Sequence, residues 1–203
     1  MEISLALDVS QEGARDRLHR LQARLALASH PIFVSRGSSD DLFAQIRHYL
    51  NRASDQKLID DSPREIRVKL VMSDPAPDVP GATHSIGIAG PRNFRRDPAL
   101  PHFTRHADKA RLDLQISTRE AGGQVEILAY AFELVLPEGA PFPFVRFDLN
   151  HDQHPNASLG LRSHLHLGTD DDGYSVPGSM LSPFEVLDII VHRVRATGRS
   201  RTM

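Results

Sequence analysis

The chain has 203 residues, of which 40% are hydrophobic and 25% are charged, and its formal net charge is −2. This balance gives no overall field that would draw the chain to nucleic acid or to an anionic membrane. Cysteine is absent, which excludes disulfides, thiolate catalysis and cysteine-ligated zinc. Because the sequence has neither a basic, apolar signal-peptide start nor a run of about 18 apolar residues, we expect a cytoplasmic single domain over residues 1–203 without membrane contact.

The N-terminal part, about residues 8–53, is expected to be helical. In residues 11–29, apolar side chains recur at intervals of three and four and therefore share one helix face: Ala14, Leu18, Leu21, Leu25 and Ala28. Pro31 ends this predicted helix, because the residue before a proline avoids the helical region. Residues 32–34 are typical of a short buried strand, and a second helix is predicted over residues 38–52.

Residues 64–178 alternate between strand-like segments and turn-rich links. Alternating apolar residues predict strands over residues 65–73, 84–89, 111–116, 125–136, 144–150, 162–167 and 174–176. Within residues 125–136 the apolar phase slips, and a β-bulge near Leu128 and Ala129 would reconcile the two halves. Runs of strands joined by turns favour an α+β fold over alternating βα units.

The last helix has the clearest local signal in the chain. Ser182 can cap it, Pro183 suits its first position and Glu185 completes a capping box, so a helix is predicted over about residues 183–196. We therefore expect an α+β domain with two N-terminal helices, one C-terminal helix and a largely antiparallel, strongly curved or barrel-like sheet.

Residues 90–109 form the longest stretch without clear periodicity. Several arginines there are interleaved with Phe94 and Phe103, a pattern that can bind a single-stranded nucleic acid through charge and stacking. Asp97 and Asp108 dilute that charge, so a plain irregular loop is the alternative.

Residues 144–178 concentrate titratable side chains, including four of the chain's 11 histidines: His151, His154, His164 and His166. Alternation places Arg146 and Asp148 on one face of the first predicted strand, and His164 and His166 on one face of the next. If the two strands pair antiparallel with these faces together, the four side chains become neighbours.

This cluster suits phosphodiester cleavage without a cofactor. Two imidazoles two residues apart on a strand stand about 6 to 7 Å apart and titrate near neutral pH, so one can take a proton while the other gives one. Arginines can hold the phosphate in bidentate fashion. For an enzyme acting on RNA or a nucleotide, the hypothesis assigns catalytic roles to His164, His166 and Asp148 and substrate-binding roles to Arg146, Arg162 and His154.

Three alternatives remain open. His164, His166 and Asp148 can instead form a divalent-metal site of the kind that holds zinc, iron or manganese. The protein can be a non-catalytic module that binds or regulates a protein partner. The two histidines can also be structural, with both rings solvated or bonded to backbone carbonyls. The sequence does not predict an oligomeric state.

Four short patterns lie in this C-terminal region: Arg146-x-Asp148, His154-Pro155, Ser163-His164-Leu165-His166-Leu167-Gly168 and Ser182-Pro183-x-Glu185. Their arrangement resembles that of a group of uncharacterised bacterial proteins, some associated with toxin or phage-defence roles. The match covers about 50 of the 203 residues. The resemblance implies a bacterial chain, adds defence to the roles to be considered and transfers no catalytic residue.

Overall fold

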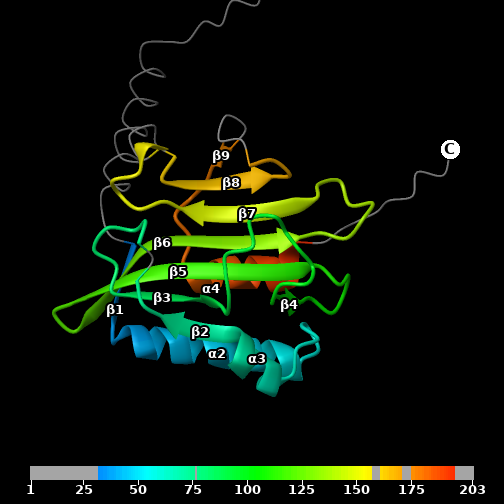
Figure 1. Ribbon diagram of the computed structural model, residues 1–203, viewed down its shortest axis with the longest axis horizontal. Coiled ribbons are helices and arrows are strands. Elements are labelled where there is room, and N and C mark those ends of the chain that lie inside the picture. The colour runs from blue at the N-terminus through cyan, green and yellow to red at the C-terminus, as the bar shows by residue number, and fades with distance from the viewer. Residues whose placement is uncertain (1–31, 76, 157–160, 171–174, 195–203) are drawn as a thin grey trace, which may run out of the picture. The chain divides into compact units, whose positions relative to one another are not determined.

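The computed structural model describes residues 32–75, 77–156, 161–170 and 175–194, which belong to one compact unit (Figure 1). The helix predicted over residues 11–29 lies outside the described residues.

One antiparallel sheet carries the fold. In chain order the elements are β1 (Ile32–Arg36), α2 (Ser39–Asp55), α3 (Pro63–Lys69), β2 (Leu70–Ser73), β3 (His84–Ile88), β4 (Phe103–Thr104), β5 (Arg111–Ala121), β6 (Gln124–Val135), β7 (Phe144–Leu149), β8 (Ser163–Leu167), β9 (Val176–Pro177), α4 (Pro183–Asp188) and the π-helical turn η3 (Ile189–Arg193). The strand order is β2-β3-β5-β6-β7-β8-β9, with β1 also on β6 and β4 also on β5. The α+β class and the antiparallel sheet are confirmed.

The expected barrel is not formed. Within the described residues, β2 and β9 end the sheet on opposite sides and do not pair with each other, so the sheet is open. It also begins earlier than residue 64, because β1 pairs with the first half of β6.

The strand predicted over residues 65–73 is wrong in its first half, which forms α3. The Oγ of Ser62 accepts from the backbone N–H of Glu65, and the Glu65 carboxylate accepts from the Ser62 N–H at 2.8 Å. This capping box satisfies donors that a helix start otherwise leaves open. Ile66 is fully buried whereas Val68 is 66% exposed, which is the pattern of an amphipathic helix turn.

The C-terminal helix starts as predicted but changes form before residue 196. Ser182 and Glu185 make the same reciprocal capping box. The α-helix ends at Asp188 and η3 follows it. The guanidinium of Arg105, which is 4% exposed, donates to the Ile190 carbonyl of η3 at 2.6 Å and so gives this carbonyl a hydrogen-bond partner.

The core lies on one face of the sheet. Its fully buried strand residues include Leu112, Leu114, Ile116, Phe132, Leu134 and Leu149, and its main helix residues are Ile46, Leu50, Val186, Leu187 and Ile190. Each such side chain contributes about 1.5 to 3 kcal/mol when removed from water. In Figure 1, α4 lies on one side of the sheet, and the segment from β3 to β4 crosses the other side.

The predicted β-bulge is present at Leu128. Ser117 pairs with Ala129 but Thr118 pairs with Ile127, so Leu128 is the extra residue. Bulges re-aim the side chains that follow them. Here the bulge lets Ile127 face the core while Ala129 faces the opposite side of the sheet, where the polar cluster lies.

Candidate functional site

The polar faces of β7 and β8 come together as predicted. Arg146 pairs with His166, and Asp148 pairs with His164, in an antiparallel register. Because the side chains of paired residues in adjacent strands lie on the same face, these four side chains are direct neighbours.

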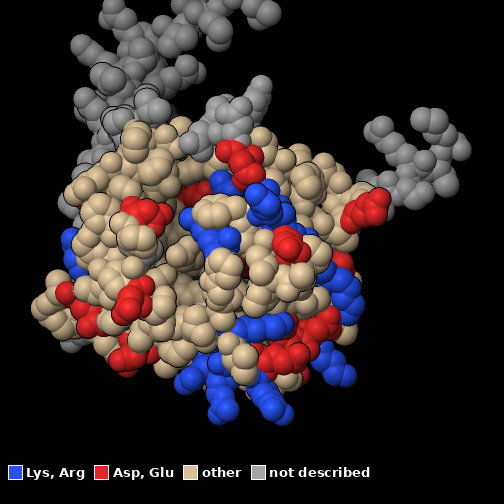
Figure 2. Space-filling view, viewed as in Figure 1, with Lys and Arg blue, Asp and Glu red and all other residues tan. Residues whose placement is uncertain are grey.

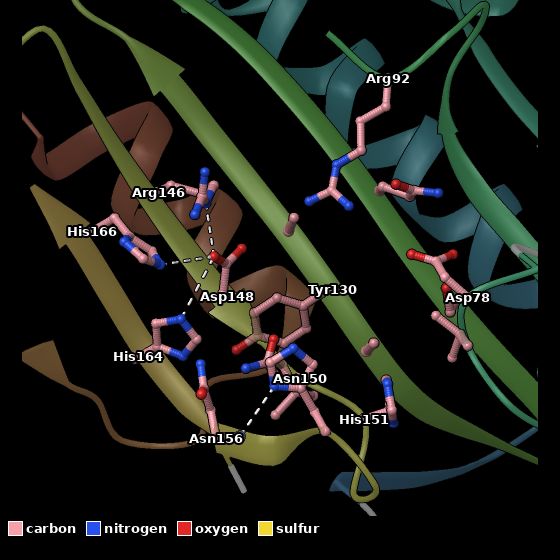
Figure 3. A pocket seen from close by; sticks show the side chains of 17 residues that line it. Asp78, Arg92, Tyr130, Arg146, Asp148, Asn150, His151, Asn156, His164 and His166 are labelled. Atoms are coloured by element: carbon pink, nitrogen blue, oxygen red, sulfur yellow. Dashed lines mark hydrogen bonds and ion pairs between the residues drawn. The ribbon is translucent and has the colours of Figure 1, made fainter. Parts of the chain in front are cut away.

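Strands β5 and β6 extend this polar face into two rows. From β5 to β8, one row consists of Asp113, Glu133, Arg146 and His166, and the other of Gln115, Ala131, Asp148 and His164. Because Ala129 and Ala131 are short, the face is hollow over β6. A cavity of about 400 Å³ occupies this hollow (Figure 3). Loop residues complete its lining: Asp78, Val79, Arg92, Asn150, His151, His154 and Asn156.

The histidines of β8 both turn toward Asp148. The Asp148 Oδ2 lies 3.3 Å from the His166 Nε2, 3.8 Å from the His164 Nε2 and 2.7 Å from the Arg146 Nε, from which it accepts a hydrogen bond. The two imidazole rings lie 4.8 Å apart at 69°. His166 is fully buried and His164 is 3% exposed, so this cluster forms the inner wall of the cavity.

The contact of the His166 Nδ1 with a backbone carbonyl shows which of the two ring nitrogens carries the proton. This Nδ1 lies 3.2 Å from the Thr169 carbonyl, which can only accept, so Nδ1 is the donor. The Nε2 of a neutral ring then directs its lone pair at the carboxylate of Asp148. That approach is favourable only if a cation, either a proton or a metal ion, lies between the two atoms.

The carboxylate of the cluster is held in its charged form. Burial acts to raise the pKa of Asp148, but the approach of the His166 ring, when it is protonated, and the charge of Arg146 outweigh it and keep the pKa below its usual value. A second pair of histidines, His151 and His154, also lines the cavity. Burial first, and then the charge of His154, lower the pKa of His151. Those two rings lie 5.6 Å apart, edge to face.

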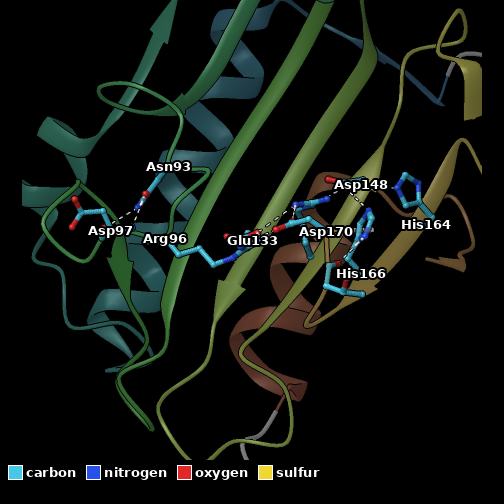
Figure 4. A network of polar contacts seen from close by, with 10 residues as sticks. Asn93, Arg96, Asp97, Glu133, Asp148, His164, His166 and Asp170 are labelled. Carbon is cyan, nitrogen blue, oxygen red and sulfur yellow. Dashed lines mark hydrogen bonds and ion pairs between the residues drawn. The ribbon is translucent and has the colours of Figure 1, made fainter. Parts of the chain in front are cut away.

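The two arginines predicted to bind phosphate both have protein partners. Besides Asp148, the guanidinium of Arg146 donates to Asp170 at 2.5 Å and lies 3.6 Å from Glu133, so three carboxylates contact it. Figure 4 shows the network of polar contacts to which Glu133, Asp148 and Asp170 belong. Arg162 is 3% exposed, and its Nε donates to the Asn150 carbonyl at 3.1 Å. It is not among the described residues that line the cavity.

Arg92 is a cavity-facing residue that spacing alone did not single out. It belongs to the loop in which arginines and phenylalanines interleave, and its guanidinium lies 4.7 Å from the centre of the Phe94 ring. Other arginines of that loop have structural partners. Arg96 stacks on Phe144 and pairs with two carboxylates, while Arg105 is buried.

No family model, curated protein or solved structure matches this chain. The resemblance to uncharacterised bacterial proteins therefore stays a prediction. Among the described residues, none of the helices has the length and apolarity needed to cross a membrane.

Proposed function

We propose that the protein is a divalent-metal-dependent hydrolase that cleaves a phosphate ester in RNA or a nucleotide, with Asp148, His164 and His166 as the metal ligands. The observation that supports it most directly is the convergence of one ligand atom from each residue, all within 4.8 Å of one another. A tetrahedral ion with bonds of about 2.1 Å separates its ligand atoms by about 3.4 Å. The contacts of 3.3 and 3.8 Å to the Asp148 carboxylate bracket that value.

A metal site fits this geometry better than the acid/base pair inferred from the sequence. Both histidines direct Nε2 at one carboxylate oxygen rather than at two positions across a substrate. The bond between Nδ1 of His166 and the Thr169 carbonyl is the outer-shell contact that orients metal-bound histidines. Two imidazoles and one carboxylate suit zinc, iron or manganese.

The remaining residues can assist the reaction. A bound ion would supply an activated water near neutral pH. Arg146 orients Asp148 through its hydrogen bond of 2.7 Å. The backbone N–H of Asn156 donates to the Nδ1 of His154, so the Nε2 of that ring carries the proton and can donate a hydrogen bond to a substrate oxygen.

The test begins with metal binding. Protein stripped with chelator and then dialysed is titrated with Zn²⁺ or Mn²⁺ by calorimetry, using the wild type, Asp148→Asn, His164→Ala and the exposed-site control His48→Ala. We expect one ion per chain in the wild type and the control. The two ligand variants should lose more than the 10- to 100-fold affinity typical of removing an outer-shell partner. Equal ion binding by all four proteins would exclude this site.

Two further measurements separate a site from a structural cluster. Loaded protein is assayed against RNA, cyclic nucleotides and an activated phosphodiester, and turnover must disappear in Asp148→Asn. Urea unfolding of the His164→Ala/His166→Ala double variant is then measured in chelator. Residues kept for function are often held at some cost to stability, so we expect the variant to be as stable as the wild type or more so. A loss of several kcal/mol would make the histidines structural.

A further inference from the structure

A second cavity lies beside the first on the same face of the sheet. It has a volume of about 390 Å³, and both cavities are lined by Arg92, Gln115, Ala131 and Arg146. Together they are large enough for a small organic ligand, since such sites usually measure 300 to 1,000 Å³. Figure 2 shows this face, where basic and acidic side chains gather around hollows in the surface.

Arg92 is the cation available to an anionic ligand at the junction. No carboxylate of the described residues makes a salt bridge with it, whereas Arg96 and Arg146 each contact Glu133 and Asp170. The face of Phe94 supports its guanidinium. In Figure 3 the Arg92 side chain extends from its loop toward the strands that form the cavity floor. A guanidinium in this position suits bidentate binding of phosphate.

The second cavity offers an aromatic surface and a carboxylate. Phe94 is 68% exposed, so its ring is accessible for stacking. Asp113 lies on the cavity floor and forms no salt bridge among the described residues, unlike its cross-strand neighbour Glu133, which Arg96 contacts at 2.8 Å. An ionised carboxylate only accepts hydrogen bonds, through two adjacent oxygens. Guanine is the base whose edge offers two adjacent N–H donors.

We infer that the joined cavities bind a guanine nucleotide, with its phosphate between Arg92 and the Asp148 cluster, its base against Phe94, and the N–H groups of the base donating to Asp113. This inference rests on the proposed function because it places the scissile phosphate in the same cavity. Binding itself requires neither turnover nor a bound ion, so it can be measured separately.

The experiment measures binding of GMP, AMP and ribose 5-phosphate by calorimetry at pH 7.5 in chelator. The proteins are the wild type, Arg92→Met, Asp113→Asn and the control Arg95→Met, which replaces an exposed arginine of the same loop that lines neither cavity. Urea midpoints confirm that each variant is folded. We expect the wild type and the control to bind GMP at least tenfold more tightly than AMP.

The two site variants test separately the binding of the phosphate and the binding of the base. Arg92→Met should weaken all three ligands about tenfold or more. Asp113→Asn should abolish the preference for GMP over AMP and leave ribose 5-phosphate unchanged. Equal affinity of the wild type for GMP and AMP, unchanged binding by Arg92→Met, or no nucleotide binding at all would overturn the inference.

The outcome is independent of the metal test. Ion binding at Asp148 without nucleotide binding would leave the hydrolase proposal in place with another phosphate ester as substrate. Guanine-selective binding without ion binding would support the nucleotide site and refute the metal-dependent mechanism.

Discussion

Replacing Asp113 with asparagine should stabilise the protein at neutral and alkaline pH. Burial first, and then the charge of Glu133, raise the pKa of Asp113 from 3.8 to about 6, against the backbone hydrogen bond from Leu114 and the charge of Arg92, which lower it. A carboxyl whose pKa is higher in the folded protein favours folding fully below pH 3.8, and this contribution is lost as the pH rises through about 6. At 1.36 kcal/mol for each unit of pKa difference, the total is about 3 kcal/mol.

Asparagine has nearly the same shape as aspartate and does not titrate. The variant therefore does not lose stability as the pH rises through the pKa of Asp113. Urea unfolding followed by circular dichroism at pH 4, 6 and 8 measures the free energy of unfolding of the wild type, Asp113→Asn and the exposed-site control Asp74→Asn. Asp113→Asn should exceed the wild type by up to about 3 kcal/mol at pH 8, and the gap should shrink toward zero at pH 4. A gap that is absent at pH 8, or that the control reproduces, would refute the reasoning.

The same unfolding assay tests three structural predictions. Ser62→Ala should cost about 1 kcal/mol because it removes the cap of α3; unchanged stability would show that the capping box is dispensable. Gly87→Ala should cost about 1 to 3 kcal/mol, since the new Cβ would lie 2.7 Å from the backbone oxygen of Leu114, and a neutral result would mean that the two strands separate easily. Arg105→Met should cost about 1 to 3 kcal/mol because it removes a buried guanidinium that donates to the carbonyls of Ile190 and Val194; unchanged stability would contradict this.

The faces of the central hairpin could be predicted because alternation specifies them, and a shift of one residue would bury the wrong set of side chains. Alternation does not distinguish registers that differ by two residues, so the pairing of Arg146 with His166 and of Asp148 with His164 was an assumption that the structure confirms. The bulge at Leu128 was detectable from alternation as well, as a change in apolar phase.

The sequence contained two conflicting signals where α3 begins. Residues 66–72 alternate as a strand does, yet Ser62 and Glu65 repeat the capping box that Ser182 and Glu185 form at α4. The cap decided the structure of the first turn, and the strand began only at Leu70.

The chemistry of the arginines could not be predicted from spacing. Asp170 contacts Arg96 across 74 positions of the chain, and this contact together with Glu133 determines which guanidinium is occupied by carboxylates. Arg92 and Arg96 have similar neighbours in the sequence and opposite roles in the structure. The open edges of the sheet could not be predicted either. They depend on which strands become neighbours, and the periodicity of each strand does not specify its neighbours.

The residues that determine the volume of the cavity differ from those that form its titratable cluster. Ala129 and Ala131 determine the room above the sheet, whereas Asp148 and its histidine partners lie on the next two strands. Under the proposed function, a related gene with a larger residue in place of either alanine would accept a smaller substrate while keeping Asp148 and its histidine partners. Specificity would then diverge first at positions 129 and 131, whose side chains only limit the volume of the cavity.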